Sequence, residues 1–458
     1  MLIVMTGSIE ALVANEVFRS IDEQVIGSLG KPSRGYWIAL AICGVLVFAG
    51  VVAYLFQYYV GMGVTGLNIP VGWAVYITNF VFWIGIAHSG TLISAILYLF
   101  RTKWRNGISR SAEAMTIFAI MTAGLFPLIH LGRVWLFYWL LPYPNWRHLW
   151  PNFKSPLVWD VVAVSTYFTV SLLFFYLGLI PDLATARDNT PEGSRKKLYA
   201  FLSLGWTGRY EQWRHYTRCY LALACLATPL VISVHSVVSW DFAMSLVKGW
   251  HTTIFAPYFV AGAIHSGLAM VITLLVPLRK VLRLERILTP YYFEQMALMM
   301  ILTGSIVAYA YGVEAFMSWY SADKFEQQFT MYRAFGSVYS PLFWTMLVFN
   351  VAVPMTFFFK KLRTNLSYLV VAAILVNIGM WLERFVIIVV SLSHDYLPSS
   401  WGLYAPRAVE IVLFLFSFGF FAGLFLTFVK LFPAIPMSEL KKQIMEQRAE
   451  SNVGMSEH

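Results

Sequence analysis

Ten long apolar runs constrain this sequence more than any other feature. Each is long enough to cross a hydrocarbon core of roughly 30 Å as a helix. Only 12% of the residues are charged, against roughly a quarter in soluble domains, and no run alternates in polarity as barrel strands do. We therefore predict an all-α integral membrane protein of about ten transmembrane helices. The runs cover about residues 36–60, 71–100, 112–138, 155–180, 219–240, 253–277, 291–319, 340–359, 367–391 and 407–429.

The basic residues are distributed unevenly between the two sides of these runs. Most Lys and Arg lie before the first run, after the last one, and in the connections at 101–110, 187–218, 279–286 and 360–363. The positive-inside rule then places both termini in the cytoplasm. The net charge of +10 is accordingly a consequence of topology, and we expect no binding to nucleic acid.

The first 35 residues lack a basic start followed by an apolar core, and they carry several acidic residues. We interpret 1–35 as a cytoplasmic amphipathic arm rather than a signal peptide. Cys43, Cys219 and Cys225 form no CxxC or CxxCH spacing. We therefore expect this chain to hold no iron–sulfur cluster, haem or other metal of its own.

A motif is repeated within the chain. GIAHSG at 85–90 recurs as GAIHSG at 262–267, and the runs around it match in the same order. Because four helices repeat, and four is even, both copies have the same orientation. We predict two parallel-repeat four-helix bundles with two extra C-terminal helices. The divisions are an arm at 1–35, the first bundle at 36–180, a cytoplasmic linker at 181–218, the second bundle at 219–360, two additional helices at 361–432 and a cytoplasmic tail at 433–458.

Ionisable residues inside apolar runs are candidates for function. His130 and Asp160 are expected at nearly one level of consecutive helices, His130 about eight residues, or ~12 Å, below the outer face. Arg133 is predicted one turn above His130 on the same helix. The plainer interpretation is a buried pair that holds two helices together. Further candidates are His88, His235, His265, Glu314, Glu383, Arg384 and Glu410.

The two motif histidines have three interpretations. They could pack beside small residues that let helices approach closely. They could belong to a proton path with side chains toward the inner ends of the same bundles, namely Ser89, Glu113, Ser266 and Glu294. Axial haem ligation is disfavoured because each run holds at most one histidine. We interpret His235 as a packing residue, and we expect the adjacent Glu383 and Arg384 to point apart and to pair elsewhere, for example with Glu314 or Glu410.

The pattern IGIAHSGT at 84–91, the two bundles and the ten spans resemble membrane subunits of the NrfD, or polysulfide-reductase, family. Within it the chain resembles the ActC-type subunits of bacterial alternative complex III. The resemblance implies a multi-pass subunit of the bacterial cytoplasmic membrane that oxidises quinol, with menaquinol expected. It also implies a periplasmic iron–sulfur subunit, c-type cytochrome subunits, a second NrfD-like membrane subunit and lipids as partners.

For such a protein, His130 and Asp160 would accept the two protons of quinol, and Arg133 would orient them. Trp83, Phe126 and Trp135 could line the pocket for the ring. The corresponding positions of the second copy are Tyr311, Glu314 and Thr345, so this acid–base pair is expected only in the first bundle. Without a redox centre, the chain must pass electrons to its partner. Proton translocation is a further expectation.

Two other classes remain open from the sequence. A secondary transporter can also have parallel repeats and buried charges, although it should use both halves for its site. A haem-b quinol cytochrome would bind its cofactor between helices.

Overall fold

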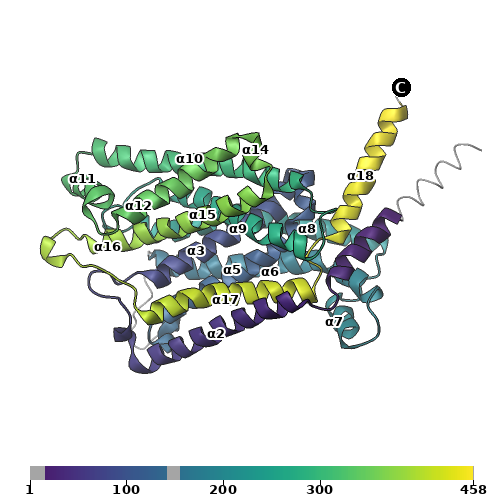
Figure 1. Cartoon of the computed structure of the whole chain (residues 1–458), viewed down its shortest axis with the longest axis horizontal. Helices are drawn as coiled ribbons and strands as arrows, with labels where there is room; N and C mark the ends of the chain where they lie inside the picture. Colours follow the sequence, from purple (N-terminus) through teal and green to yellow (C-terminus); the bar gives the residue numbers. More distant parts are fainter. Residues whose placement is uncertain (1–15, 142–154, 457–458) are drawn as a thin grey trace, which may run out of the picture.

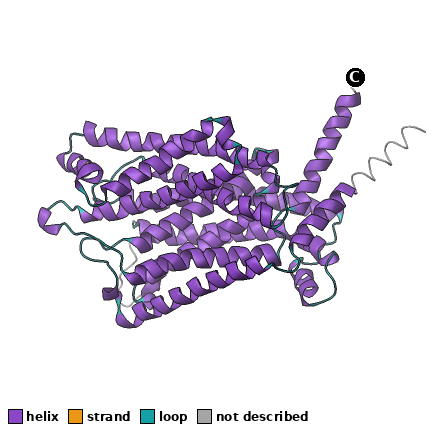
Figure 2. Cartoon of the chain, viewed as in Figure 1, coloured by secondary structure: helices purple, strands orange, loops and turns teal. Residues whose placement is uncertain are grey.

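The computed structural model describes residues 16–141 and 155–456, with side chains up to residue 446. Within these residues the structure is helical and contains no strand (Figure 2), which confirms the predicted all-α class, while the division into two repeated bundles stays a prediction. Ten helices are long and apolar enough to span a membrane. They are α2 (Arg34–Val60), α3 (Val75–Thr91, continuing to Leu99), α5 (Ser109–His130), α6 (Pro156–Asp188), α8 (Tyr210–Ala243), α9 (Phe255–Val281), α10 (Pro290–Tyr320), the broken helix Ser340–Phe358 that begins with α12 (Ser340–Leu347), α15 (Leu366–Phe385, continuing to Ser393) and α17 (Ala408–Leu431).

The helices run side by side between two ends of the molecule (Figure 1). One end carries a helix at 16–28, α7 (Ser194–Leu202) and α18 (Met437–Ser456). We call this the terminal end. The other, here called the distal end, carries α11 (Lys324–Met331) and α16 (Ser391–Ser393). The N-terminal arm and the C-terminal tail therefore lie at the same end, as an even number of spans requires. The first 15 residues of the predicted arm lie outside the described residues.

Helix α3 is the most enclosed of the spans. In its most apolar stretch 94% of the residues are buried, against 11% in α2, which packs along α17 and otherwise presents apolar side chains outward. A membrane helix can expose apolar side chains to lipid at no hydrophobic cost, so only close packing holds helices together there. Helix α3 is therefore the helix around which the others are assembled.

The repeated motif forms the crossing between α3 and α9. A Cβ on Gly85 would lie 3.5 Å from Ser266 Oγ, and one on Gly267 would lie 2.3 Å from Ser89 Oγ. Gly90 makes the equivalent approach to α5, where a Cβ would lie 2.2 Å from the backbone oxygen of Ala112. Glycine is needed at Gly267 and Gly90 because the neighbouring helix leaves no room for a side chain, whereas a Cβ on Gly85 would make an ordinary contact.

Candidate functional site

At the distal end of the first bundle, a polar cluster surrounds His130, the last residue of α5. Its ring lies edge-on to Tyr76, with centroids 6.4 Å apart, and its Nδ1 has no hydrogen-bond partner in the described structure. The Tyr76 hydroxyl donates to Gln57 Oε1 at 2.6 Å, and Gln57 Nε2 donates to the carbonyl of Ile129 at 3.0 Å. Phe126, one turn before His130, packs on Tyr76. This half-buried imidazole therefore has a ring nitrogen available to a ligand.

Asp160 lies one turn into α6 and forms a hydrogen bond with Asp241 of α8. Asp160 is buried, and Oδ1 of each carboxyl has no hydrogen-bond partner. Two carboxyl groups can form a hydrogen bond only when they share a proton. The pair can take up or release a proton while the remaining oxygens stay available. The described contacts join Asp160 to Asp241 rather than to His130.

Two of the predicted site residues lie elsewhere than expected. Helix α5 ends at His130 rather than near Tyr138, because Pro127 is in its last turn and Gly132 takes a left-handed φ of 65°. Arg133 is therefore exposed beyond the helix, not one turn above His130 on the same helix. His130 is itself the last residue of α5, whereas the prediction placed it eight residues, or ~12 Å, before the helix end.

The three predicted aromatic residues are also separated. Trp135 is 54% exposed and packs on Tyr58, so it does not line a buried slot. Trp83 is buried against Phe418 and Phe421 of α17. Of the three, Phe126 lies in the cluster around His130.

A buried carboxylate supports the distal end close to this cluster. Glu410, in the first turn of α17, accepts from the Tyr404 hydroxyl and from the backbone N–H of Gly66, both at 2.6 Å. Burial, reinforced by the hydrogen bond to Glu410, raises the pKa of Tyr404 above its ordinary value, so Tyr404 remains a donor. Glu410 thus ties α17 to the loop that precedes α3.

Near the terminal end, a second buried cluster surrounds Arg110 of α5. Its guanidinium forms ion pairs with Glu113 Oε2 at 3.0 Å and with Asp182 Oδ2 at 3.2 Å. The Tyr220 hydroxyl donates to Glu113 Oε1 at 3.3 Å. All four side chains are buried, and such charges are stable only because each has a partner. Glu113 also lines a cavity of ≈ 10 Å³, enough for about one water molecule, whose other polar walls are Thr91, Ser94, Thr116 and Ser171.

Polar groups continue from this cavity to His88 in the middle of the α3 span. The Tyr167 hydroxyl contacts Thr91 Oγ1 at 2.8 Å, and its ring lies 5.1 Å from that of His88. His88 Nδ1 donates to the carbonyl of Ile84 at 2.6 Å, which leaves Nε2 without a partner. The rings of His88 and His235 are in contact, with centroids 4.5 Å apart, and neither ring nitrogen of His235 is bonded. His235, predicted as a packing residue, therefore touches a candidate proton carrier.

The second half of the chain contains its own acid–base cluster, on α15 and the helices of the second bundle that pack against it. Arg384 pairs with the adjacent Glu383 at 2.5 Å, contrary to the expectation that they point apart. Glu383 Oε2 accepts from the Tyr311 hydroxyl and from Asn350 Nδ2. Nearer the distal end, Arg333 pairs with Glu314 at 2.6 Å. Buried acid–base groups are therefore not confined to the first bundle.

Phe259 of α9 lies between His235 of α8 and Arg384 of α15. Its ring is 5.9 Å from the ring of His235 and 4.2 Å from the Arg384 guanidinium. Because His235 also contacts His88, the polar groups of the first bundle come close to those around Arg384.

The remaining candidates of the predicted proton path lie apart from these clusters. His265 Nδ1 contacts Thr303 Oγ1 at 3.0 Å inside the second bundle. Glu294 pairs with Arg363 near the terminal surface at 3.0 Å. Ser89 and Ser266 lie in the α3–α9 crossing and bond to backbone oxygens of their own helices.

In the described part of the chain, four π-helical turns lie in the same regions, at Leu92–Ile96, Tyr332–Gly336, Val348–Ala352 and Val386–Val390. The first follows His88 by one turn, the second and third contain Arg333 and Asn350, and the fourth follows Arg384. Such turns interrupt regular backbone bonding and occur frequently at functional sites.

Sequence reasoning missed Asp241, Gln57, Arg110 and Asp182. Helix α6 continues to Asp188 and α8 begins at Tyr210, so both extend into the predicted linker at 181–218. Asp182 and Arg110 were therefore assigned to surface connections although both are buried. The sequence feature that could have identified Asp182 and Arg110 is a charged residue at the end of an apolar run. Among the described residues, no group of three or more His, Cys, Asp or Glu side chains is placed to hold a metal ion.

Similar proteins are membrane subunits of oxidoreductases. A Halobacterium salinarum protein named as a dimethyl sulfoxide reductase membrane subunit is 28% identical over 54% of this chain and 52% of its own length. An Hdr-like menaquinol oxidoreductase integral membrane subunit of Archaeoglobus fulgidus is 24% identical over 88% of this chain and 95% of its own length. A selenate reductase subunit of Mesobacillus selenatarsenatis is 23% identical over 50% and 54%. The alignments with the first and third proteins span about half of each relative.

A family profile described as "Polysulphide reductase, NrfD" matches residues 63–393, which include all but the first and last of the ten spans. This match covers most of the chain and both of its histidine motifs. The chain therefore belongs to the NrfD family of polysulphide-reductase-type membrane proteins.

Proposed function

We propose that this chain is the membrane subunit of a respiratory complex that oxidises quinol, with menaquinol as the expected donor, at the distal end of its first bundle. The distal end faces the periplasm and the terminal end the cytoplasm, in accordance with the distribution of Lys and Arg. The electrons pass to a periplasmic iron–sulfur subunit, and from there to c-type cytochromes. A second NrfD-like subunit and lipids complete its surroundings, as in the ActC-type subunits that it resembles.

The observation that carries this proposal is the pair of proton acceptors at the distal ends of α5 and α6. Oxidation of a hydroquinone to a quinone releases two electrons and two protons. His130 Nδ1 is free to accept one proton, and the Asp160–Asp241 pair can accept another when it holds a single proton. Tyr76 and Gln57 fix the wall beside His130. The name of the Archaeoglobus relative, a menaquinol oxidoreductase subunit, supports the choice of donor.

We further propose that protons cross the membrane along the buried polar groups. The path begins at Glu113 and continues through the small cavity, Tyr167 and His88 to His235. It passes beside Phe259 to Glu383 of α15, which is paired with Arg384. From there it leaves toward the distal end through Tyr311 and Glu314, the second of which is paired with Arg333. This route keeps His88 and Glu113 of the predicted proton path and leaves out His265 and Glu294.

Variants of the distal acceptors test quinol oxidation. In the intact complex, His130→Ala and Asp160→Asn should each lower turnover with a menaquinol analogue on the order of 100-fold, because each removes a general base. Asp241→Asn should have a similar effect, since it removes the partner that shares the proton of Asp160.

The matched control is Thr345→Val, at the position of the second bundle that corresponds to Asp160. Thr345 donates only to the carbonyl of Pro341 in its own helix, so turnover should stay within about twofold of wild type. Assembly of each variant is checked by the recovery of partner subunits. Wild-type turnover in assembled His130→Ala and Asp160→Asn complexes would reject the site.

A further inference from the structure

The start of α18 is fixed into the terminal end by polar contacts with three different segments. The backbone N–H of Ser438 donates to Asp182 Oδ1 at 3.0 Å, and Asn106 Nδ2 donates to Gln443 Oε1 at 3.1 Å. Lys441 pairs with Asp22 at 2.6 Å. Met437 and Leu440 are buried beneath these contacts. The first turns of α18 thus lie against the terminal ends of α5 and α6, which carry Arg110 and Asp182, and the rest of the helix projects away from the body (Figure 1).

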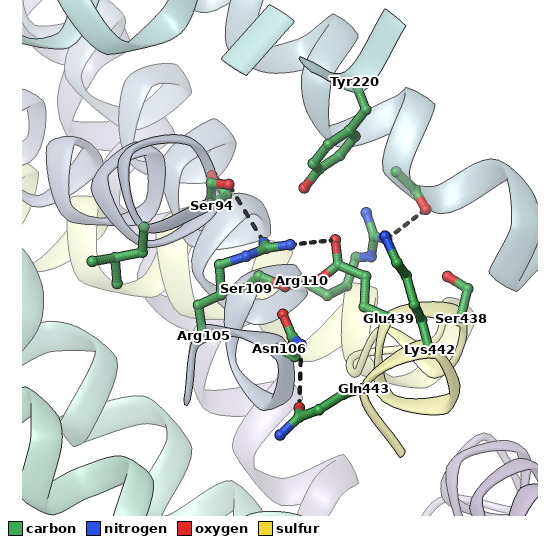
Figure 3. A network of polar contacts seen from close by, with 12 residues as sticks. Ser94, Arg105, Asn106, Ser109, Arg110, Tyr220, Ser438, Glu439, Lys442 and Gln443 are labelled. Atoms are coloured by element: carbon green, nitrogen blue, oxygen red, sulfur yellow. Dashed lines mark hydrogen bonds and ion pairs between the residues drawn. The ribbon is translucent and has the colours of Figure 1, made fainter. Parts of the chain in front are cut away.

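Glu439 extends from α18 into this junction. Figure 3 shows its carboxylate reaching toward Arg105, which it contacts at 3.1 Å, and Ser109 Oγ donates to its other oxygen at 3.1 Å. Burial alone would lower the pKa of Arg105, but the charge of Glu439 raises it above the ordinary value, so the guanidinium stays charged. Arg105 also donates to the backbone oxygen of Ser94 at 3.4 Å, and Ser94 lines the small cavity. Glu439 is therefore connected through one side chain to the wall of that cavity.

Accessibility distinguishes Glu439 from the other acids of the junction. Its side chain is 12% exposed, whereas those of Glu113 and Asp182 are 4% and 0% exposed. A proton arriving from bulk water can reach a partly exposed carboxylate directly, but it needs a relay to reach a buried one. Tyr220, which is bonded to Glu113, lies beside Glu439 in the same network (Figure 3).

We propose that Glu439 is the carboxylate through which protons are taken up from the terminal side, so that the C-terminal helix is part of the proton path. The inference rests on the proposed proton path. Glu439 binds a proton from water, and the proton passes by way of Tyr220 or bound water to Glu113; Glu439 is then ionised again beside Arg105. No bond other than O–H bonds forms or breaks, and no redox partner is needed at this step.

The test measures proton uptake per electron from the terminal side of the complete complex in oriented proteoliposomes. Glu439→Gln should lower the rate of uptake on the order of tenfold, because it removes an acid–base group and keeps the shape. Quinol oxidation with an uncoupler present should stay within about twofold of wild type, since the distal acceptors are unchanged. Glu439→Asp should restore uptake. The matched control is Glu446→Gln on the same helix, where a 55% exposed carboxylate contacts Lys442 at 3.8 Å.

A cross-link between α18 and the bundle distinguishes a role of Glu439 in proton uptake from a role in holding α18 in place. Cysteines in the variants Asn106→Cys and Gln443→Cys, whose native side chains are bonded to each other, should be joined by a short bifunctional thiol cross-linker only while α18 is docked. Normal uptake in Glu439→Gln would overturn the inference. So would an uptake defect that is repaired when the cross-link holds α18 in place, because docking alone would then explain it. If the wild-type complex takes up no protons beyond those of quinone chemistry, the proposed path fails, and with it this role.

Discussion

At the scale of single residues, two basic side chains meet at the distal end. Lys248 Nζ lies 3.2 Å from His394 Nδ1 and donates to the carbonyl of Asp395 at 2.8 Å. The His394 ring stacks on Trp401 and Tyr332, with centroids 4.1 and 4.3 Å away, and is 1% exposed. Burial, and next the charge of Lys248, lower the pKa of His394. The histidine is therefore neutral when it accepts from Lys248.

This contact predicts that acid destabilises the loop that joins α16 to α17. Because the pKa of His394 is lower in the folded state, the unfolded chain binds more protons below about pH 6.5, and stability falls as pH falls. The slope from one such group is at most about 1.4 kcal/mol per pH unit. Thermal unfolding of the purified protein between pH 8 and 5.5 should show this loss, and His394→Gln should reduce it.

The control is His251→Gln, since His251 is exposed at the same end and contacts only the carbonyl of Ser245. The unfolding temperature of His251→Gln should change with pH as that of the wild-type protein does. If His394→Gln lost stability between pH 8 and 5.5 as steeply as wild type, His394 would not be the group responsible for the loss.

Sequence reasoning found many residues of the candidate site, but few of their contacts. An ionisable residue inside an apolar run is conspicuous, which is why His88, His130, Asp160 and Glu383 were singled out. Position along a helix gives depth, but the neighbour across a bundle depends on how each helix is rotated. For this reason Asp160 was assigned to His130, although its hydrogen-bond partner is Asp241.

At the scale of helices, the ten spans could be predicted because apolar length is a direct property of sequence. Their ends could not. Helix α6 continues past the apolar run to Asp188, where charged residues are stable because they pair or reach water. Helix α5 stops before its apolar run ends, because Gly132 takes a left-handed turn. Backbone chemistry at the ends, rather than hydropathy, decides these boundaries.

The glycines of the repeated motif give a prediction at this scale. Gly90→Ala and Gly267→Ala would place a Cβ 2.2 Å and 2.7 Å from backbone oxygens of α5 and α3. Overpacking of this kind costs about 1–3 kcal/mol, so each variant should unfold at lower temperature. The fraction of folded protein after heating in detergent, followed by size-exclusion chromatography, measures this loss.

Gly44→Ala and Gly124→Ala serve as controls, because a Cβ at either position meets nothing within 4 Å. Alanine favours a helix over glycine by about 1 kcal/mol, so these variants should be as stable as wild type or more so. Equal stability of all four variants would show that the α3–α9 and α3–α5 crossings are not close-packed.

At the scale of the whole molecule, the polar groups of the two bundles are not independent. His88 of the first bundle contacts His235 of the second, and the ring of Phe259 contacts both His235 and Arg384 of α15. These contacts join the buried polar groups of the first bundle to those around Glu383 in the second half of the chain. A secondary transporter would need this centre for its substrate, whereas a proton path needs only titratable groups and water.

Replacing His235 tests this crossing. His235→Phe keeps an aromatic ring against His88 and Phe259 but removes the titratable nitrogens. Protons translocated per electron should fall to the number expected from quinone chemistry alone, while quinol oxidation at the distal end continues. The measurement is the same uptake assay in proteoliposomes, with the electron-transfer rate recorded in parallel.

His265→Phe is the matched variant, since His265 carries the second copy of the motif and contacts Thr303 inside its own bundle. It should leave the proton stoichiometry unchanged. If His265→Phe abolished translocation and His235→Phe did not, the path would run through His265, and the contacts across Phe259 would be packing alone. If both variants translocated normally, no proton would pass through either histidine, and the proposed crossing would be wrong.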